Sequence, residues 1–288
     1  MSIFYWRYEL LPKHALSAIA GTTPRQGALI LVDGGVADVH PWPELGDATI
    51  DSQLDQLRRG ETTPLTRRSL AMAHLDRDAR TAAKNLFEGQ VIPRSHWPAA
   101  AGDVPKAFDT VKVKMGRGVW IDPALARYRL RLDFNATLTA GEFTSFALSL
   151  PPAVRRALDF VEDPCPYDSN VWTAIRQTTG VRLALDRGDA EDGVDVLVVK
   201  PAVQEMPITK KEVVITSYMD HPVGQLFAAY TAAKEGIGSA CGLATHLLFE
   251  SDPFIERMQL DGARLQPVGG TGIGFDDLVE KLEWKRLA

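Results

Sequence analysis

Short apolar runs, each closed by a charged residue, recur along the middle of the chain. Five such runs lie between residues 110 and 201, and they end in Lys114, Asp133, Glu162, Asp186 and Lys200. The first four of these charged residues follow one another at intervals of 19 to 29 residues. A strand, a helix and their two loops take roughly 30 residues in a (β/α)8 barrel. The pattern therefore predicts parallel barrel strands, each with a charged residue at its carboxyl end.

The spacing becomes shorter in the second half of this region. Asp186 and Lys200 are only 14 residues apart, and Lys200 and Ser217 are only 17 apart. The glycine- and aspartate-rich segment 188–193 is typical of a turn. These intervals are too short for full helices. We therefore expect a TIM-type α/β barrel of seven or eight strands in which helices five and six are reduced or lost.

The first 90 residues follow a different pattern. Segments 3–10, 27–35 and 36–40 are rich in β formers, and the second runs into an Asp-Gly turn. Helices are expected over 51–59 and from Pro64 to Gly89, the second one capped by Thr63. A mixed sheet followed by helices predicts an α+β domain over residues 1–90. The barrel domain is expected over 91–250, beginning near residues 91–93, and residues 251–288 form a C-terminal segment.

The charged strand ends would meet at one mouth, where barrel enzymes place their catalytic groups. Three adjacent carboxylates repel one another, and a divalent cation relieves that repulsion. Ligands that are all oxygen atoms favour Mg²⁺ over zinc. A lysine beside a metal and other lysines can lose its proton near neutral pH and act as a base. One charged strand end is ordinary solvated surface, but five in succession with the acids grouped between lysines favour a functional site.

Two further side chains share faces with this set. Lys112 lies two residues before Lys114, and Asn135 lies two residues after Asp133. Alternate residues of an extended strand point the same way. Both side chains are therefore candidates for the same mouth.

Composition excludes several other classes of protein. The chain has 288 residues and a formal net charge of −5, so no basic surface argues for nucleic acid. No apolar run reaches the length of a membrane span, and the first residues lack the layout of a signal peptide, so a cytoplasmic enzyme without a membrane partner is expected. No Gly-x-Ser-x-Gly motif and no strand-led Gly-x-Gly-x-x-Gly motif is present. The two cysteines have no zinc-ligand spacing, and nothing indicates the oligomeric state.

Five motifs in these runs resemble those of the enolase superfamily, in its muconate-lactonizing subgroup. They are Lys-Val-Lys at 112–114, Arg-Leu-Asp-Phe-Asn at 131–135, Val-Glu-Asp-Pro at 161–164, Leu-Asp at 185–186 and Val-Val-Lys-Pro at 198–201. Within that subgroup the chain is most similar to the o-succinylbenzoate synthases. The resemblance covers residues 110–201 well and the flanking segments more weakly.

The resemblance implies a capped barrel with a defined site. The α+β domain would cap the barrel, with its loop 12–26 closing over a small-molecule carboxylate substrate, and segment 251–288 would pack back on the cap. Mg²⁺, with Mn²⁺ as an alternative, would be held by Asp133, Glu162 and Asp186. Lys114 would be the base, Lys112 would stabilise developing negative charge, and Lys200 would stand on the opposite side of the mouth. The expected substrate-binding residues are Ser217, Asp220, Gly242, Leu243 and Asn135.

The reaction implied is the syn-dehydration of 2-succinyl-6-hydroxy-2,4-cyclohexadiene-1-carboxylate to o-succinylbenzoate, a step of menaquinone biosynthesis. An N-acylamino acid racemase or dipeptide epimerase would use the same lysines and stays open as an alternative. A ligand-binding relic without turnover is an alternative of another class. The intact acids and lysines argue against the relic, and the shortened barrel favours the synthase.

Overall fold

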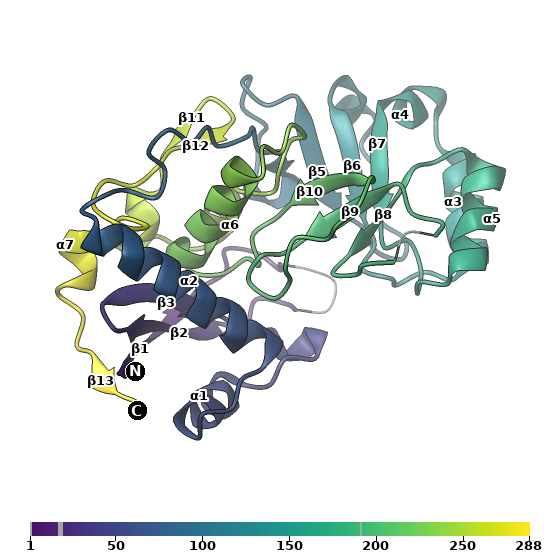
Figure 1. The fold of residues 1–288 in the computed structure, drawn as a ribbon. Coiled ribbons are helices and arrows are strands. Elements are labelled where there is room, and N and C mark those ends of the chain that lie inside the picture. Colours follow the sequence, from purple (N-terminus) through teal and green to yellow (C-terminus); the bar gives the residue numbers. More distant parts are fainter. Residues whose placement is uncertain (1, 17–19, 191) are drawn as a thin grey trace.

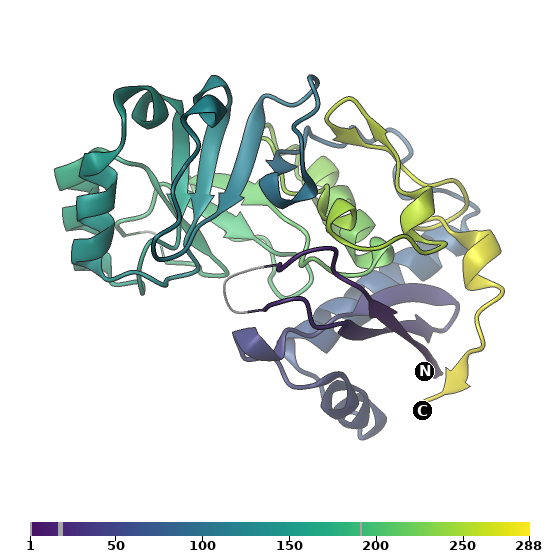
Figure 2. The ribbon, with the colours of Figure 1, turned by 180° about the vertical axis from the view of Figure 1, so that it is seen from behind.

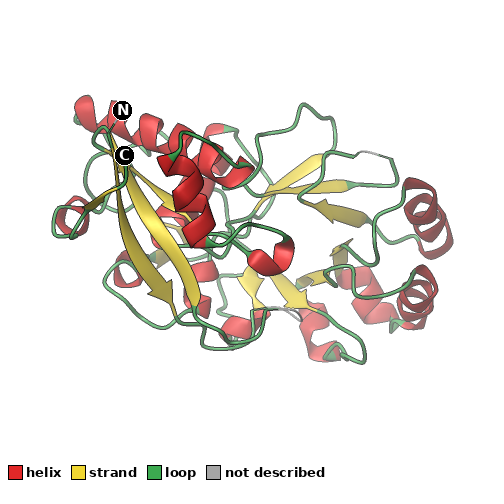
Figure 3. Ribbon diagram, turned by 90° about the horizontal axis from the view of Figure 1, so that it is seen from below, coloured by secondary structure: helices red, strands yellow, loops and turns green. Residues whose placement is uncertain are grey.

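Two sheets organise the molecule, and the computed structural model describes them within residues 2–16, 20–190 and 192–288. The first sheet has four strands in the order β13-β1-β2-β3, and the second has seven in the order β10-β9-β8-β7-β6-β5-β4. Figures 1 and 3 show the first sheet beside one end of the second, with helices on the outside of both. The architecture is a mixed α/β fold with an antiparallel N-terminal sheet and a curled parallel sheet, as the sequence predicts.

The N-terminal sheet is built on a hairpin. It contains β1 (Ile3–Leu10), β2 (Arg25–Val32) and β3 (Gly35–Val39). The connection between β2 and β3 is the predicted Asp-Gly turn, with φ of 48° at Asp33 and 94° at Gly34. Positive φ at both central residues matches the right-handed twist of the strands. Of the loop expected over 12–26, residues 17–19 lie outside the described part of the chain, and the loop ends where β2 begins.

Helices of the N-terminal half cover one face of this sheet. They are η1 (Pro43–Leu45), α1 (Ile50–Arg58) and α2 (Pro64–Thr81), and α2 packs on β2 and β3. Thr63 forms the expected capping box at the start of α2. The prediction that α2 continues to Gly89 is wrong. Ala83 adopts a left-handed φ of 52°, and the chain then pairs with Gly272 through the backbone of Lys84 and Leu86.

The parallel strands run in sequence order around a barrel. They are β4 (Trp97–Pro98), β5 (Thr110–Lys114), β6 (Arg129–Asp133), β7 (Leu158–Glu162), β8 (Leu183–Asp186), β9 (Val196–Val199) and β10 (Glu212–Ile215). The first strand lies at 97–98 and not at 91–93. Just before it, the Ile92 carbonyl accepts a hydrogen bond from Arg264, which ties that segment to the C-terminal part of the chain.

A very short segment closes the barrel. Cys241 forms a parallel bridge with Ser95 at one edge, and Gly242 forms one with Thr216 at the other. Backbone hydrogen bonds support both edges, including 2.8 Å from the His96 N–H to the Cys241 carbonyl and 2.8 Å from the Gly242 N–H to the Ile215 carbonyl. Residues 241–242 therefore act as an eighth strand of minimal length.

Helices surround only part of the barrel. They are η2 (Ala99–Ala101), η3 (Pro123–Arg127), α3 (Ala140–Ser149), α4 (Pro152–Ala157), α5 (Ser169–Thr179) and α6 (Pro222–Lys234). The described residues form no helix between β8 and β9 or between β9 and β10. This confirms the expected loss of helices five and six. None of the helices in the described ranges is both long and apolar enough to cross a membrane.

The C-terminal segment returns to the first sheet. After η4 (Thr245–Leu248), which precedes it, this segment forms η5 (Ile255–Arg257), β11 (Leu260–Asp261), β12 (Arg264–Leu265), α7 (Asp276–Val279) and β13 (Lys285–Arg286). Seen from behind in Figure 2, its yellow ribbon runs from the barrel back to β1, which pairs with β13.

One buried carboxylate fixes this return. Asp76 of α2 accepts hydrogen bonds from the backbone N–H groups of Val36 at 2.7 Å and Ile273 at 2.6 Å. Arg80 pairs with the same carboxylate at 2.5 Å and with Asp276 at 2.6 Å. The Asp76 side chain is fully buried. The glycine-rich turn at 269–274 is therefore a structural contact to α2.

Candidate active site

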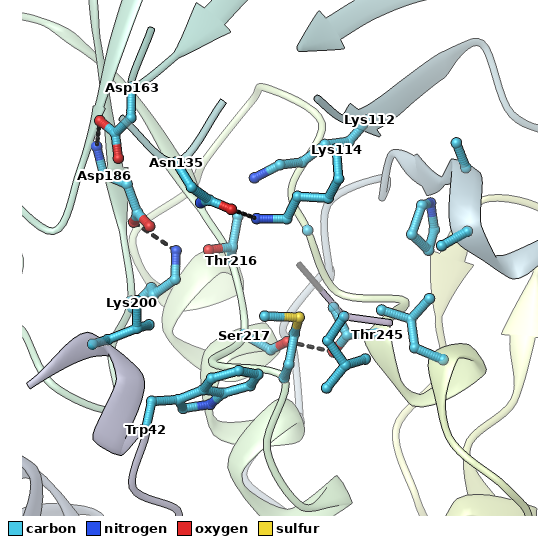
Figure 4. A pocket seen from close by; sticks show the side chains of 18 of the residues that line it. Trp42, Lys112, Lys114, Asn135, Asp163, Asp186, Lys200, Thr216, Ser217 and Thr245 are labelled. Atoms are coloured by element: carbon cyan, nitrogen blue, oxygen red, sulfur yellow. Dashed lines mark hydrogen bonds and ion pairs between the residues drawn. The ribbon is translucent and has the colours of Figure 1, made fainter. Parts of the chain in front are cut away.

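A cavity of about 210 Å³ lies at the carboxyl ends of the barrel strands. Its lining includes Lys112, Lys114, Asn135, Asp186 and Lys200 from the strand ends. His14, Ala15, Leu16, Trp42 and Leu45 line it from the N-terminal domain. The N-terminal domain and the barrel therefore share one cavity, which Figure 4 shows from close by.

Strand register brings the lysines and carboxylates together. Lys114 is the register partner of Asp133, and Asp133 is the register partner of Glu162. The Lys112 Nζ lies 2.8 Å from Asp133 Oδ2 and 2.7 Å from Glu162 Oε2. The Lys114 Nζ lies 2.6 Å from the same Asp133 oxygen. The alternation of side chains along β5 explains why both lysines reach the Asp133 carboxylate.

The third acid has its own lysine. The Lys200 Nζ lies 2.5 Å from Asp186 Oδ1, and both side chains are about nine-tenths buried. The dashed lines of Figure 4 show this pair on the opposite side of the cavity from Lys112 and Lys114. The structure thus brings together all three predicted carboxylates and all three predicted lysines, with the lysines divided between two sides.

Burial concentrates the charges of this cluster. The side chains of Asp133 and Glu162 are 0% and 2% exposed. Burial and the neighbouring Asp133 carboxylate raise the pKa of Glu162 to about 7, although Lys112 opposes this. Burial also works against ionised Asp133, but Lys112 and Lys114 overcome it and hold its pKa well below the ordinary value. The carboxylates thus depend on nearby positive charge to stay ionised.

The donor set fits a hard divalent cation. Its members are carboxylates, and Mg²⁺ and Mn²⁺ prefer such oxygen ligands. No group of three His, Cys, Asp or Glu side chains within residues 2–16, 20–190 and 192–288 is already spaced to hold a metal ion. Instead, the ammonium groups of Lys112, Lys114 and Lys200 contact oxygen atoms of the Asp133 and Asp186 carboxylates. The buried carboxylates need positive charge nearby to stay ionised. A bound divalent cation would contact the same carboxylate oxygen atoms that the lysines contact.

Left-handed backbone conformations cluster around the cavity. Asn135, Asp163, Arg187 and Met219 have φ of 47°, 42°, 56° and 50°, and each follows the carboxyl end of a barrel strand. All four line the cavity. Such conformations cost about 1–3 kcal/mol each in a non-glycine residue and are concentrated at functional sites. Periodicity in the sequence gives no signal for them.

The wall opposite the carboxylates is formed by β10, the closing segment and β4. Ser217 and Gly242 line this wall, as expected, and the Ser217 Oγ lies 2.5 Å from Thr245 Oγ1. A Cβ atom on Gly242 would lie 2.7 Å from the Thr216 methyl group, so a larger residue there would force neighbouring side chains to shift. His96, Thr216, Thr245, Met219 and Trp42 also line the cavity and were missed by the sequence.

Two predicted substrate-binding residues lie outside the cavity lining. Leu243 is fully buried, and its backbone N–H donates to Ser95 Oγ at 3.0 Å. Asp220 is 1% exposed and lies beside Gly224, across from Asp38 of β3. Burial raises the pKa of Asp220 to about 7. Both residues belong to packing layers behind the cavity wall.

Trp42 is held rigidly against the barrel. Its Nε1–H donates to the Tyr218 carbonyl at 2.7 Å, and the Arg25 guanidinium stacks over its ring at 4.0 Å. Arg25 is 4% exposed and is paired with Glu44 at 2.7 Å. Trp42 thus presents a fixed apolar surface to the cavity.

Comparison with known proteins decides the family. A family model described as "O-succinylbenzoate synthase, N-terminal domain" matches residues 3–79. An o-succinylbenzoate synthase of Bdellovibrio bacteriovorus is 35% identical, with 100% of this chain and 99% of that protein covered. The chain belongs to the o-succinylbenzoate synthase family. A second synthase, of Pectobacterium atrosepticum, is 33% identical over 28% of this chain and 27% of its own.

Solved structures show that this synthase-family chain has the enolase-superfamily fold. A dipeptide epimerase of Enterococcus faecalis, complexed with Mg and L-Leu-L-Tyr, matches with a TM-score of 0.76 and 16% identity, covering 95% of this chain and 98% of that one. A dipeptide epimerase of Cytophaga hutchinsonii, complexed with Mg and D-Ala-L-Val, matches with a TM-score of 0.75 and 14% identity, covering 100% and 99%. A protein of E. faecalis described as a member of the enolase superfamily matches with a TM-score of 0.73 and 14% identity, covering 100% and 99%.

Proposed function

We propose that this chain is an o-succinylbenzoate synthase. It would catalyse the Mg²⁺-dependent syn-dehydration of 2-succinyl-6-hydroxy-2,4-cyclohexadiene-1-carboxylate to o-succinylbenzoate in menaquinone biosynthesis. The observation that carries the proposal is the full-length similarity to the B. bacteriovorus synthase. A cavity that gathers lysines on two sides of a carboxylate cluster supports it.

Asp133, Glu162 and Asp186 are the proposed ligands of Mg²⁺, for which Mn²⁺ is an alternative. When bound, the metal withdraws electron density from the substrate carboxylate and makes the adjacent C–H bond more acidic. Support comes from the all-oxygen donor set and from the Mg complexes of two similarly folded epimerases. Asn135, whose side-chain oxygen lies 3.3 Å from Lys114 Nζ, would orient that lysine.

Lys114 is the proposed base. Its Nζ takes the proton from the ring carbon that carries the carboxylate, and Lys112, an ammonium between Asp133 and Glu162, stabilises the negative charge that develops. The electron pair left by the proton forms the new C=C bond as hydroxide departs from the neighbouring carbon. Lys114 returns its proton to that hydroxide on the same face. Water and an aromatic ring are the products, so atoms and charge balance.

Lys200 faces the substrate from the other side. In a synthase it holds the cyclic substrate by charge and by a cation–π contact. In a racemase the same position would supply a second base for the opposite enantiomer. The two functions therefore differ in what Lys200 does, although they share the cavity.

A turnover assay separates the candidate functions. Purified protein with Mg²⁺ is expected to convert the cyclohexadiene substrate to o-succinylbenzoate, and Lys114→Ala is expected to lower the rate by about 10²–10⁴-fold or more. Lys200→Arg should slow dehydration, yet Lys114 should still exchange the α-proton of a bound analogue with solvent deuterium. Loss of exchange from only one enantiomer of an N-acylamino acid, without dehydration by the wild type, would indicate the racemase. Absence of all turnover would indicate a ligand-binding relic.

A further inference from the structure

The cavity wall opposite the carboxylates carries an unused hydrogen-bond donor. The carboxylates lie on β6, β7 and β8, whereas β10, residues 241–242 and β4 form the far side of the closed barrel. His96 precedes β4 on that far side and lines the cavity. It is 5% exposed, so its ring is almost completely enclosed by protein.

The protonation of the His96 ring follows from its partner. Its Nδ1 lies 3.2 Å from Nη1 of Arg131. A guanidinium can only donate, so Nδ1 must accept, and in the neutral ring the proton sits on Nε2. Burial and the positive charge of Arg131 keep the ring neutral, because both lower the pKa of His96 well below its ordinary value.

Arg131 cannot turn away from this contact. Its Nε donates to Asp159 Oδ2 at 2.9 Å, and its Nη1 also donates to the Ala240 carbonyl. The guanidinium stacks on Phe160 at 4.6 Å from the ring centroid, and the residue is 2% exposed. Arg131 therefore fixes the orientation of the His96 ring and the position of its proton.

The Nε2–H group is the remaining donor of the His96 ring. Among the residues that the structure describes, none forms a hydrogen bond with His96 Nε2. The adjacent Cε1 atom faces Gly242 so closely that a Cβ there would lie 3.0 Å from it. Because His96 lines the cavity, its Nε2–H can donate to an acceptor of a bound ligand. The glycine leaves the room that such a ligand needs.

We propose that His96 is a specificity-determining residue whose Nε2–H donates to the distal carboxylate of the substrate's succinyl side chain. The proposal rests on the proposed function and adds to it one recognition contact, the hydrogen bond from His96 to the distal carboxylate. A substrate whose ring carboxylate faces β6–β8 directs its other end toward β10, Gly242 and β4. There a neutral donor recognises a carboxylate oxygen without adding another positive charge to a cavity that already holds three lysines.

Binding of two ligands tests the assignment. The ligands are the product o-succinylbenzoate and 2-butyrylbenzoate, which keeps the ketone and replaces the distal carboxylate with a methyl group. Calorimetric titrations in the presence of Mg²⁺ compare the wild type with His96→Phe. This variant keeps an aromatic ring but lacks the Nε2–H donor. It is expected to weaken o-succinylbenzoate binding about 10- to 100-fold, as for a hydrogen bond to a charged group. Binding of 2-butyrylbenzoate should change by less than about threefold, since it lacks that acceptor.

A second variant distinguishes recognition from support of the fold. His96→Gln places an amide N–H near the position of Nε2, so it should recover most of the affinity for o-succinylbenzoate. In turnover, His96→Phe should raise KM far more than it lowers kcat. Equal weakening of both ligands, or failure of glutamine to recover the loss, would overturn the assignment.

The wild type separates this failure from failure of the proposed function. Turnover by the wild type with no ligand selectivity in His96→Phe removes only the role of His96. A wild type that neither dehydrates the substrate nor binds o-succinylbenzoate removes the proposed function, and the role of His96 falls with it.

Discussion

The buried acid pair between the N-terminal domain and the barrel makes stability depend on pH. Asp38 of β3 and Asp220 of the loop after β10 both lie against Gly224. Asp38 accepts hydrogen bonds from the Tyr8 hydroxyl at 2.6 Å and from the His221 N–H at 3.1 Å. Asp220 Oδ1 is buried without a partner among the described residues. We predict that Asp220→Asn stabilises the protein at alkaline pH.

The sign and size follow from the pKa of Asp220. Burial raises this pKa from 3.8 to about 7. Below the lower value, folded and unfolded chains both hold the proton. Between about pH 4 and 7 only the folded chain keeps it, so the free energy of unfolding falls as pH rises. The full shift of about three pKa units corresponds to a loss on the order of 4 kcal/mol, complete above about pH 7.

Asparagine is neutral throughout and should escape this loss. The stability difference between Asp220→Asn and the wild type should therefore grow in favour of the variant from about pH 4 to pH 7 and then stay constant. Urea unfolding at about pH 4, 6 and 8 measures it, with equal m values as the check on two-state behaviour. Asp103→Asn, at an exposed aspartate, is the matched control and should show no such trend. A variant less stable than the wild type at pH 8, or a difference independent of pH, would refute the reasoning.

Three further predictions concern the metal, the contact of the C-terminal segment with α2, and the cavity wall opposite the carboxylates. Asp133→Asn and treatment with EDTA should each reduce turnover by about a thousandfold or more, since the metal supplies several kcal/mol of charge stabilisation; full turnover after EDTA would exclude the metal. Asp76→Ala should lower the free energy of unfolding by about 3–5 kcal/mol because it leaves the Val36 and Ile273 N–H groups without their acceptor and removes one of the two carboxylate partners of Arg80, and urea unfolding would show it. Gly242→Ala places a Cβ 2.7 Å from the Thr216 methyl and 3.0 Å from His96 Cε1; steady-state assays should show a raised KM with a folded protein, and an unchanged KM would count against a substrate contact there.

The strand ends could be predicted from the sequence because their signal is local. An apolar run that ends in a charged residue predicts both a strand and the residue at its carboxyl end. Lys114, Asp133 and Glu162 follow directly from this pattern. The closing segment at 241–242 gives no such signal, because two residues show no periodicity and their pairing depends on distant edges. The end of α2 was missed for a related reason, since Gly272, far along the chain, draws residues 84–86 into another pairing.

Side chains on loops were harder to place than those on strands. The family resemblance predicts that Asp220 binds substrate, but after the left-handed turn at Met219 its side chain lies beside Gly224, close to Asp38. His96 precedes a two-residue strand, and its role as a hydrogen-bond donor depends on its contact with Arg131, which lies on a different strand. Such roles come from contacts between segments, and one sequence does not contain them in any local pattern.

The pairing of β1 with β13 also sets an order on the making of the protein. During synthesis β1 emerges before the barrel strands, whereas its partner at Lys285–Arg286 emerges after them. Until residues 285–286 have been made, the outer edge of β1 presents free backbone N–H and C=O groups, which is the kind of edge that recruits other chains. The N-terminal sheet is complete only after the barrel has been made. A nascent chain stalled before residue 285 would therefore expose this edge for as long as the stall lasts.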